Sequence, residues 1–226
     1  MSEAGDIRAV LFDIDSTILV TGGAGAAAWQ RAFAELYGVE ANVAERTDAG
    51  MTDPEIAAIV FAEAVGREGG PAERARAIGA YLKHLPDTVR ESSGYRLMPG
   101  VDELLERLID AGLLLGLVTG NVEAAAHVKL SRAGLNRFFS FGGYGSDSAD
   151  RTEVTKAALR RAELVSGGKL ERAACIAVGD TPRDVRAGHG SGVRVVGVAT
   201  GKYSVAQLRE AGAEWTVETV EHGFPL

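Results

Sequence analysis

Two aspartates separated by a single residue stand at the end of a short apolar run near the start of the chain. Asp13 follows the run 10–12, and Asp15 comes after a single isoleucine. Carboxylates at positions i and i+2 can face the same way, and two close negative charges favour a bound cation or a proton on one of them. Aspartates are also common in turns and caps. The pair fits a turn or an acidic reaction centre, and its place at the end of a predicted strand favours the latter.

A second apolar run ends in Thr119, Gly120 and Asn121, directly before a predicted helix. The triplet offers a hydroxyl group, a glycine that lets the backbone approach closely, and free N–H groups at a helix start, a combination that suits an anion. Asn121 could equally serve only as a helix cap. Both interpretations stay open from the residues alone.

A third apolar run leads into residues 179–184, which read Gly-Asp-Thr-Pro-Arg-Asp. Thr181 is predicted to be an N-cap with a proline after it, which puts Asp184 near the third helical position, where it could serve only the helix dipole. Asp180 is left at the strand tip. Oxygen ligands of this kind fit a hard cation, and Mg²⁺ is the usual one where carboxylates meet a phosphate. The predicted metal ligands are Asp13, Asp15, Asp180 and Asp184.

Short apolar runs alternate with amphipathic helices along most of the chain. Strands buried on both faces are predicted at 9–12, 113–118, 173–178 and 193–198. The alternation predicts an α/β fold with a Rossmann-like parallel sheet and helices on both faces. Because ligand sites in such sheets lie beyond the carboxyl ends of the strands, the three motifs are expected to meet.

The alternation is interrupted between the first two predicted strands. Residues 19–94 contain no convincing strand but carry helical apolar stripes, such as Ile78, Tyr81, Leu82 and Leu85. We therefore predict a core domain formed by residues 1–18 and 95–226, with an inserted all-helical domain at 19–94. Glycine-containing segments at both borders suit either flexible connections or ordinary turns.

Composition excludes several classes of protein. The 226 residues are 46% hydrophobic and 24% charged, as in soluble globular proteins, and 24 basic against 31 acidic residues leave a net charge of −7. Nucleic acid is therefore not an expected main partner. The single cysteine excludes a disulfide within the chain. The acidic N-terminus does not resemble a secretory signal, and no apolar run approaches the roughly 20 residues of a membrane helix, so a cytoplasmic location is expected.

Together, the segments 13–17 and 179–184 and Thr119 resemble, in type and order, the motifs of the haloacid dehalogenase-like (HAD) phosphatases. Residues 50–53 and 98–101 resemble the phosphoglycolate phosphatase-like branch, and the position of the insertion is similar to that of its helical cap. The resemblance covers nearly the whole chain. The family usually has glycine where Ser16 stands.

The resemblance implies a Mg²⁺-dependent phosphomonoester hydrolase acting on a small phosphorylated metabolite. Asp13 would be the nucleophile that forms an aspartyl-phosphate, and Asp15 the general acid and base, with its carbonyl group also reaching Mg²⁺. Asp180 would ligate the metal directly, and Asp184 would hold a metal-bound water or a ligand in place.

The resemblance also implies a phosphate-binding group. Thr119 and the N–H groups near Gly120 and Asn121 would hold the phosphoryl oxygens. The family further expects a basic residue beside the nucleophile. Arg151 is the first choice because it begins the helix before the third motif, and Lys129 is the rival, although eight residues of helix place it about 12 Å from Asn121.

Arg46, Thr52 and Asp53 are the cap positions predicted to recognise the leaving group, although Thr52 could simply cap a helix. Three alternative functions remain: a phosphomutase, a dehalogenase, and a non-catalytic phosphate-regulated binding module. A dehalogenase would lack the second acid, which argues against it. A dinucleotide site is set aside because no Gly-x-Gly-x-x-Gly follows the first strand. The sequence indicates neither the ester nor whether the protein is a monomer or a homodimer.

Overall fold

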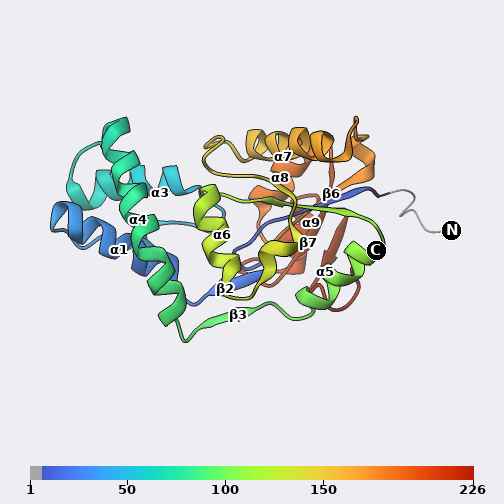
Figure 1. The fold of residues 1–226 in the computed structure, drawn as a ribbon, viewed down its shortest axis with the longest axis horizontal. Coiled ribbons are helices and arrows are strands. Elements are labelled where there is room, and N and C mark those ends of the chain that lie inside the picture. Colours follow the sequence, from blue (N-terminus) through green and yellow to red (C-terminus); the bar gives the residue numbers. More distant parts are fainter. Residues whose placement is uncertain (1–6) are drawn as a thin grey trace.

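The computed structural model describes residues 7–226 and divides into an α/β part and a helical part (Figure 1). The prediction about a secretory signal falls largely on residues 1–6, outside the described residues. No helix among residues 7–226 combines the length and apolarity needed to cross a bilayer. The cytoplasmic location stays a prediction.

The α/β part is built on a six-stranded parallel sheet in the order β5-β4-β1-β6-β7-β8. The strands are β1 (Ala9–Phe12), β4 (Leu114–Val118), β5 (Phe141–Gly143), β6 (Cys175–Gly179), β7 (Arg194–Val198) and β8 (Trp215–Val217). Phe12 lies in register with Leu117 and Val178. The ends of β1, β4 and β6 are therefore neighbours, which confirms the predicted α/β fold.

Helices cover both faces of the sheet because successive side chains of a strand point to opposite sides. Val10 and Phe12 belong to the apolar cluster that includes α5 and α6, whereas Ala9 and Leu11 belong to the one that includes α7, α8 and α9. These helices are α5 (Val101–Asp110), α6 (Glu123–Ser131), α7 (Arg151–Ser166), α8 (Pro182–Gly190) and α9 (Val205–Glu210). Short 3₁₀ helices η2 (Leu135–Phe138) and η3 (Arg172–Ala174) precede β5 and β6.

The helical part, which we call the helical cap, has its own core. It comprises α1 (Ala24–Tyr37), α2 (Val43–Arg46), α3 (Asp53–Val60), the π-helix η1 (Phe61–Val65) and α4 (Pro71–Glu91). Trp29 of α1 and Tyr81 of α4 stack with ring centroids 4.4 Å apart. In Figure 1 these helices gather at the left of the view, whereas the sheet and α7 lie to the right.

The expectation that no strand occurs between β1 and β4 is wrong. An antiparallel ribbon of β2 (Leu19–Thr21) and β3 (Tyr95–Leu97) joins the helical cap to the core. Strands of three residues are too short to show a periodic pattern, which also explains why β5 and β8 were not predicted. Of this ribbon, β2 lies inside the predicted limits of 19 and 94, and β3 begins just outside them. Those domain limits stay a prediction.

Candidate active site

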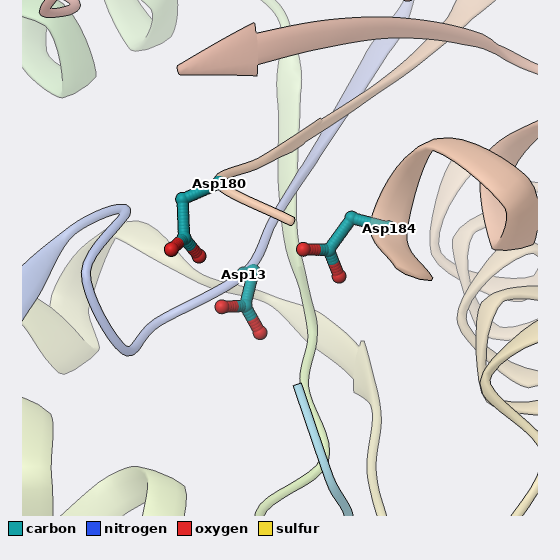
Figure 2. Close-up of side chains that lie close together, drawn as sticks. All are labelled: Asp13, Asp180 and Asp184. Atoms are coloured by element: carbon teal, nitrogen blue, oxygen red, sulfur yellow. The ribbon is translucent and has the colours of Figure 1, made fainter. Parts of the chain in front are cut away.

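Three carboxylates from distant parts of the sequence converge at the carboxyl edge of the sheet. Asp13 follows β1, Asp180 follows β6 and Asp184 lies in the first turn of α8. One oxygen from each lies within 4.8 Å of the others, and Figure 2 shows the three carboxyl groups turned toward a common space. All three are buried, with 2–7% exposure. The predicted convergence of the first and third motifs is therefore present.

Local structure holds two of these acids in place. Thr181 caps α8, as predicted, and the Asp184 carboxylate accepts hydrogen bonds from the Thr181 amide at 3.1 Å and hydroxyl at 2.7 Å. A side chain at Gly201, in the loop after β7, would collide with the Asp180 carboxylate. The residues around Gly201 carry no local sign of this role, because it depends on a contact between positions 21 residues apart.

Arg151 joins Asp13 to the third motif. Its side chain is 7% exposed, and Nη2 donates to Asp13 Oδ1 at 3.2 Å and, in a short contact, to Asp184 Oδ1. Nε and Nη1 are buried without a hydrogen-bond partner among the described residues. A buried guanidinium with spare donors can bind a further anion beside Asp13.

The acidic cluster carries more negative charge than Arg151 neutralises. Burial and the neighbouring Asp184 raise the pKa of Asp13 to about 7 despite Arg151. Burial, with Asp13 and Asp184, raises the pKa of Asp180 to about 9. Burial lowers the pKa of Arg151, but Asp184 and Asp13 outweigh it and hold that pKa above its ordinary value. The cluster is therefore suited to a cation.

The oxygens left without strong partners fit a hard divalent ion. Both oxygens of Asp184 are engaged, by Arg151 and Thr181. The Asp180 carboxylate receives only a long 3.5 Å contact from Thr17, and Asp13 Oδ2 accepts no hydrogen bond from residues 7–226. Carboxylate oxygens are the donors that Mg²⁺ prefers.

A second hydrogen-bonded centre surrounds Asp15. Lys129 Nζ lies 2.9 and 2.6 Å from the two Asp15 oxygens and 2.6 Å from Asn121 Oδ1. Asn121 Nδ2 in turn donates to Asp15 Oδ2 at 2.8 Å and to Thr119 Oγ1 at 2.7 Å. The helix-cap interpretation of Asn121 is therefore wrong: the N-cap residue of α6 is Val122, and the Asn121 side chain holds Asp15.

Lys129 reaches the site despite its distance along α6 because helical side chains lean toward the helix N-terminus. It contacts Asp15, whereas Arg151 is the base that contacts Asp13. Burial raises the pKa of Asp15, but Lys129 and Asn121 outweigh it and bring that pKa below its ordinary value. The Asp15 side chain keeps 46% exposure, so its carboxyl group stays accessible despite these contacts.

Two of the three predicted cap positions lie against the core. Asp53 accepts a hydrogen bond from the Val122 amide at 2.8 Å and donates its own amide to Gly120 O at 2.8 Å. Thr52 caps α3 in a capping box with Glu55. Arg46 instead pairs with Glu63 inside the helical cap. The sequence signalled only the cap at Thr52, because nothing local indicates the contact of Asp53 with the 119–122 loop.

Main-chain donors beside the acids also lack partners. The amide N–H groups of Ile14, Asp15 and Gly120 make no hydrogen bond within residues 7–226. Ile14 and Gly120 are buried, and buried N–H groups without partners are rare in folded proteins. Together with the Arg151 donors they could hold an anion with several oxygens.

Comparison with known proteins identifies similar sequences. A family model of haloacid dehalogenase-like hydrolases matches residues 10–198. A phosphoglycolate phosphatase of Synechococcus elongatus is 30% identical over 149 residues, which are 66% of this chain and 66% of that protein. One from Mesorhizobium japonicum is 31% identical over 139 residues, 62% and 59% of the two chains. The match thus spans less than two thirds of either relative.

Solved structures share the fold over nearly the whole chain. A predicted phosphoglycolate phosphatase from Haemophilus somnus has a TM-score of 0.75 at 20% identity, covering 95% of each chain. CbbY from Rhodobacter sphaeroides, in complex with phosphate, has a TM-score of 0.74 at 21% identity over 96% of each chain. The β-phosphoglucomutase of Clostridium difficile has a TM-score of 0.74 at 19% identity, covering 96% of this chain and 94% of that one.

Proposed function

This chain belongs to the haloacid dehalogenase-like hydrolase family, and from that premise we propose that it is a Mg²⁺-dependent phosphatase of small phosphomonoesters. The observation that carries the proposal is the set of buried donors without partners around a buried carboxylate. Arg151 Nε and Nη1 and the Ile14 and Gly120 amides adjoin Asp13 or the 119–121 loop. A phosphoryl group offers the several oxygens that these donors need.

Asp13 is the proposed nucleophile. Its oxygen would form the bond to phosphorus while the bond from phosphorus to the ester oxygen breaks, giving an aspartyl-phosphate and an alcohol. Arg151, which touches Asp13, would orient the attacking oxygen and bind a phosphoryl oxygen through its spare donors. Thr119, Gly120 and Asn121 are proposed to complete the phosphate site from the neighbouring strand.

Asp15 is the proposed general acid and base. It would protonate the leaving ester oxygen and later take a proton from the water that attacks the aspartyl-phosphate. Its carboxyl group keeps 46% exposure, so a leaving group could reach it. A dehalogenase has no need of this group, so the second acid supports a phosphatase.

Asp13, the Asp15 carbonyl group, Asp180 and Asp184 are the proposed residues of a Mg²⁺ site. The excess negative charge of the cluster and the free oxygens of Asp13 and Asp180 support this assignment. When bound, the cation would neutralise phosphoryl charge and help to orient the phosphoryl group.

We propose a small metabolite as substrate, because the helical cap lies directly on the 119–121 loop, which is the proposed phosphate site. A side chain at Gly120 would collide with the Met51 carbonyl group, so little room is left there. Since two relatives are named phosphoglycolate phosphatases, 2-phosphoglycolate is the first ester to test. Asp53 and Thr52 are proposed to contribute to leaving-group recognition; Arg46, paired with Glu63, is the weakest of the three positions.

The test is phosphate release from a panel of esters, with Mg²⁺ or with EDTA. The panel should contain 2-phosphoglycolate, glycerol phosphates, hexose phosphates and p-nitrophenyl phosphate. We expect many turnovers of at least one ester with Mg²⁺ and none with EDTA. Isomerised sugar phosphate without free phosphate would identify a phosphomutase instead. At most one equivalent of released alcohol would identify a phosphate-regulated binding module.

A further inference from the structure

The Lys129 ammonium group has no donor left for a substrate. A lysine ammonium group carries three N–H bonds, and three oxygens lie within 2.9 Å of it: both carboxylate oxygens of Asp15 and the amide oxygen of Asn121. Arg151 differs, because its Nε and Nη1 are buried without partners in the described part of the chain. Of these two cations, only Arg151 can therefore add a phosphate without losing a bond.

The contacts of Lys129 fix the orientation of Asp15. A carboxylate that is held at both oxygens by one ammonium group cannot rotate without breaking a charge-assisted hydrogen bond. Asn121 adds a third constraint through its bond to Asp15 Oδ2. Lys129 makes no contact with Asp13, Asp180 or Asp184 within hydrogen-bond or ion-pair distance.

The helical cap closes the other side of this pair. Lys129 is 5% exposed, and a Cβ at Gly25, in the first turn of α1, would lie 4.0 Å from its Cε and Nζ atoms. Asp53 of α3 holds the start of α6, the helix that carries Lys129. The low exposure of Lys129 thus depends on residues from both parts of the molecule.

We propose that Lys129 is a positioning residue that aims the Asp15 carboxyl group at the ester oxygen, and that it is not a phosphate ligand. The inference rests on the proposed function. When the bond from Asp13 to phosphorus forms, the bond from phosphorus to the ester oxygen breaks, and its electron pair goes to that oxygen, which takes the proton of Asp15. Lys129 neither gains nor loses a proton in this step. Its contribution is the alignment of the donor.

The test compares two leaving groups in Lys129→Met. An alkyl ester such as 2-phosphoglycolate needs protonation of a basic leaving oxygen, whereas p-nitrophenyl phosphate does not. We expect kcat/KM, which reports bond cleavage, to fall by about 10²-fold for the alkyl ester, a loss typical of a misplaced catalytic group. For the aryl ester the fall should be at most about threefold. The inhibition constant of inorganic phosphate should stay within about twofold.

Two further variants separate positioning from a structural role. Lys129→Arg keeps the charge and should recover part of the alkyl-ester activity. Lys129→Met should cost nothing more in the Asp15→Asn background, because the residue to be aimed is then absent. That double variant also removes both charges of the pair, so it keeps the comparison valid if Lys129→Met alone folds poorly.

Equal losses for both esters, together with weaker phosphate inhibition, would make Lys129 a phosphate ligand and overturn the inference. A full additional loss in the Asp15→Asn background would overturn it as well. If the wild-type protein hydrolyses no ester of the panel with Mg²⁺, the proposed function itself fails, and the inference fails with it; if another alkyl ester of the panel is the one hydrolysed, that ester replaces 2-phosphoglycolate in the comparison.

Discussion

The site contains two buried cations, and they differ in their partners and in how many of their donors are engaged. Arg151 bonds to Asp13 and Asp184, both from the core, and keeps two nitrogens without partners in the described structure. Lys129 bonds to Asp15 and Asn121 and has every donor engaged. The Arg151 centre therefore has unused groups of two kinds. Its free carboxylate oxygens could bind a cation, and its free N–H groups could bind an anion.

The Lys129 centre is complete by itself but lies at the contact between the core and the helical cap. The difference indicates a division of labour in the proposed reaction: the Arg151 centre binds metal and phosphoryl group, and the Lys129 centre aligns the proton donor. The following changes test this difference between the two centres.

The largest effect is expected at the nucleophile of the Arg151 centre. Asp13→Asn should lower kcat by more than about 10⁴-fold, because an amide oxygen does not form the phosphoenzyme. The fold should survive, since one of three crowded negative charges is removed. Steady-state phosphate release and circular dichroism measure the two outcomes. Asp87→Asn, an exposed change of the same kind, is the control, and activity of Asp13→Asn within tenfold of wild type would exclude Asp13 as nucleophile.

Without metal, the stability of the folded protein should depend on pH, because the Arg151 centre carries an excess of negative charge. In EDTA the folded protein holds protons on Asp180 and Asp13 up to pKa values of about 9 and about 7, above the value of 3.8 for a free aspartate. Stability contributed by these protons is present at low pH and is lost as the pH rises through those values. The melting temperature in EDTA should therefore fall from pH 5 to pH 9, and Mg²⁺ should reduce the fall.

Asp180→Asn is the matched variant for that experiment. At pH 8 folding forces wild-type Asp180 to take up a proton that it does not carry in the unfolded chain, and a neutral amide avoids this cost. The gain should be at least about 1 kcal/mol, which corresponds to roughly 2–4 °C for a chain of this size. At pH 8 in EDTA the variant should melt higher than wild type by about that amount, and it should not respond to Mg²⁺. Calorimetry measures the melting temperature and its change with Mg²⁺. A melting temperature below that of wild type, together with an intact response to Mg²⁺, would count against the proposed metal site.

A smaller effect is expected where the helical cap meets the Lys129 centre. Asp53→Ala removes the acceptor of the buried Val122 amide, so the packing of the helical cap on the core is destabilised by about 1–3 kcal/mol. We expect kcat/KM to fall about tenfold or more. Asp53→Asn keeps an oxygen acceptor and should lose less. Equal activity of both variants and wild type would show that the Asp53 contact does not limit turnover.

The smallest effect is expected at Ser16, which directly follows Asp15 in the chain. Its backbone has φ = 64°, a left-handed conformation that glycine adopts more readily. Ser16→Gly relieves this strain but increases the entropy of the unfolded chain, so stability should change by less than about 1 kcal/mol and kcat by less than about twofold. Asn42→Gly, at a residue with φ = 42° in the helical cap, is the control for denaturation midpoints. A tenfold loss of activity in Ser16→Gly would give the serine side chain a role.

Sequence patterns predicted the core of the fold well, and the reason is local. The strands β1, β4 and β6 are four or five consecutive apolar or small residues, and β7 has four such residues after Arg194, which is long enough to be recognised. Strands of three residues, two of them glycine in β5, lack such a signal. Thr181 could be predicted as an N-cap because the signal, from Thr181 to Asp184, lies within four consecutive residues.

By itself, the sequence determined that the first and third motifs would meet, since parallel strands bring their carboxyl ends to one edge of a sheet whatever lies between them. It also determined the acidic character of that edge. Only the tertiary structure decided which cation serves which carboxylate. Arg151 and Lys129 are basic residues on consecutive helices that pack on opposite faces of the sheet, and the choice depends on the direction in which each helix presents its side chain. The docking of Asp53 on the 119–122 loop was likewise decided by the packing of the helical cap on the core, a contact between residues almost seventy positions apart that leaves no local pattern.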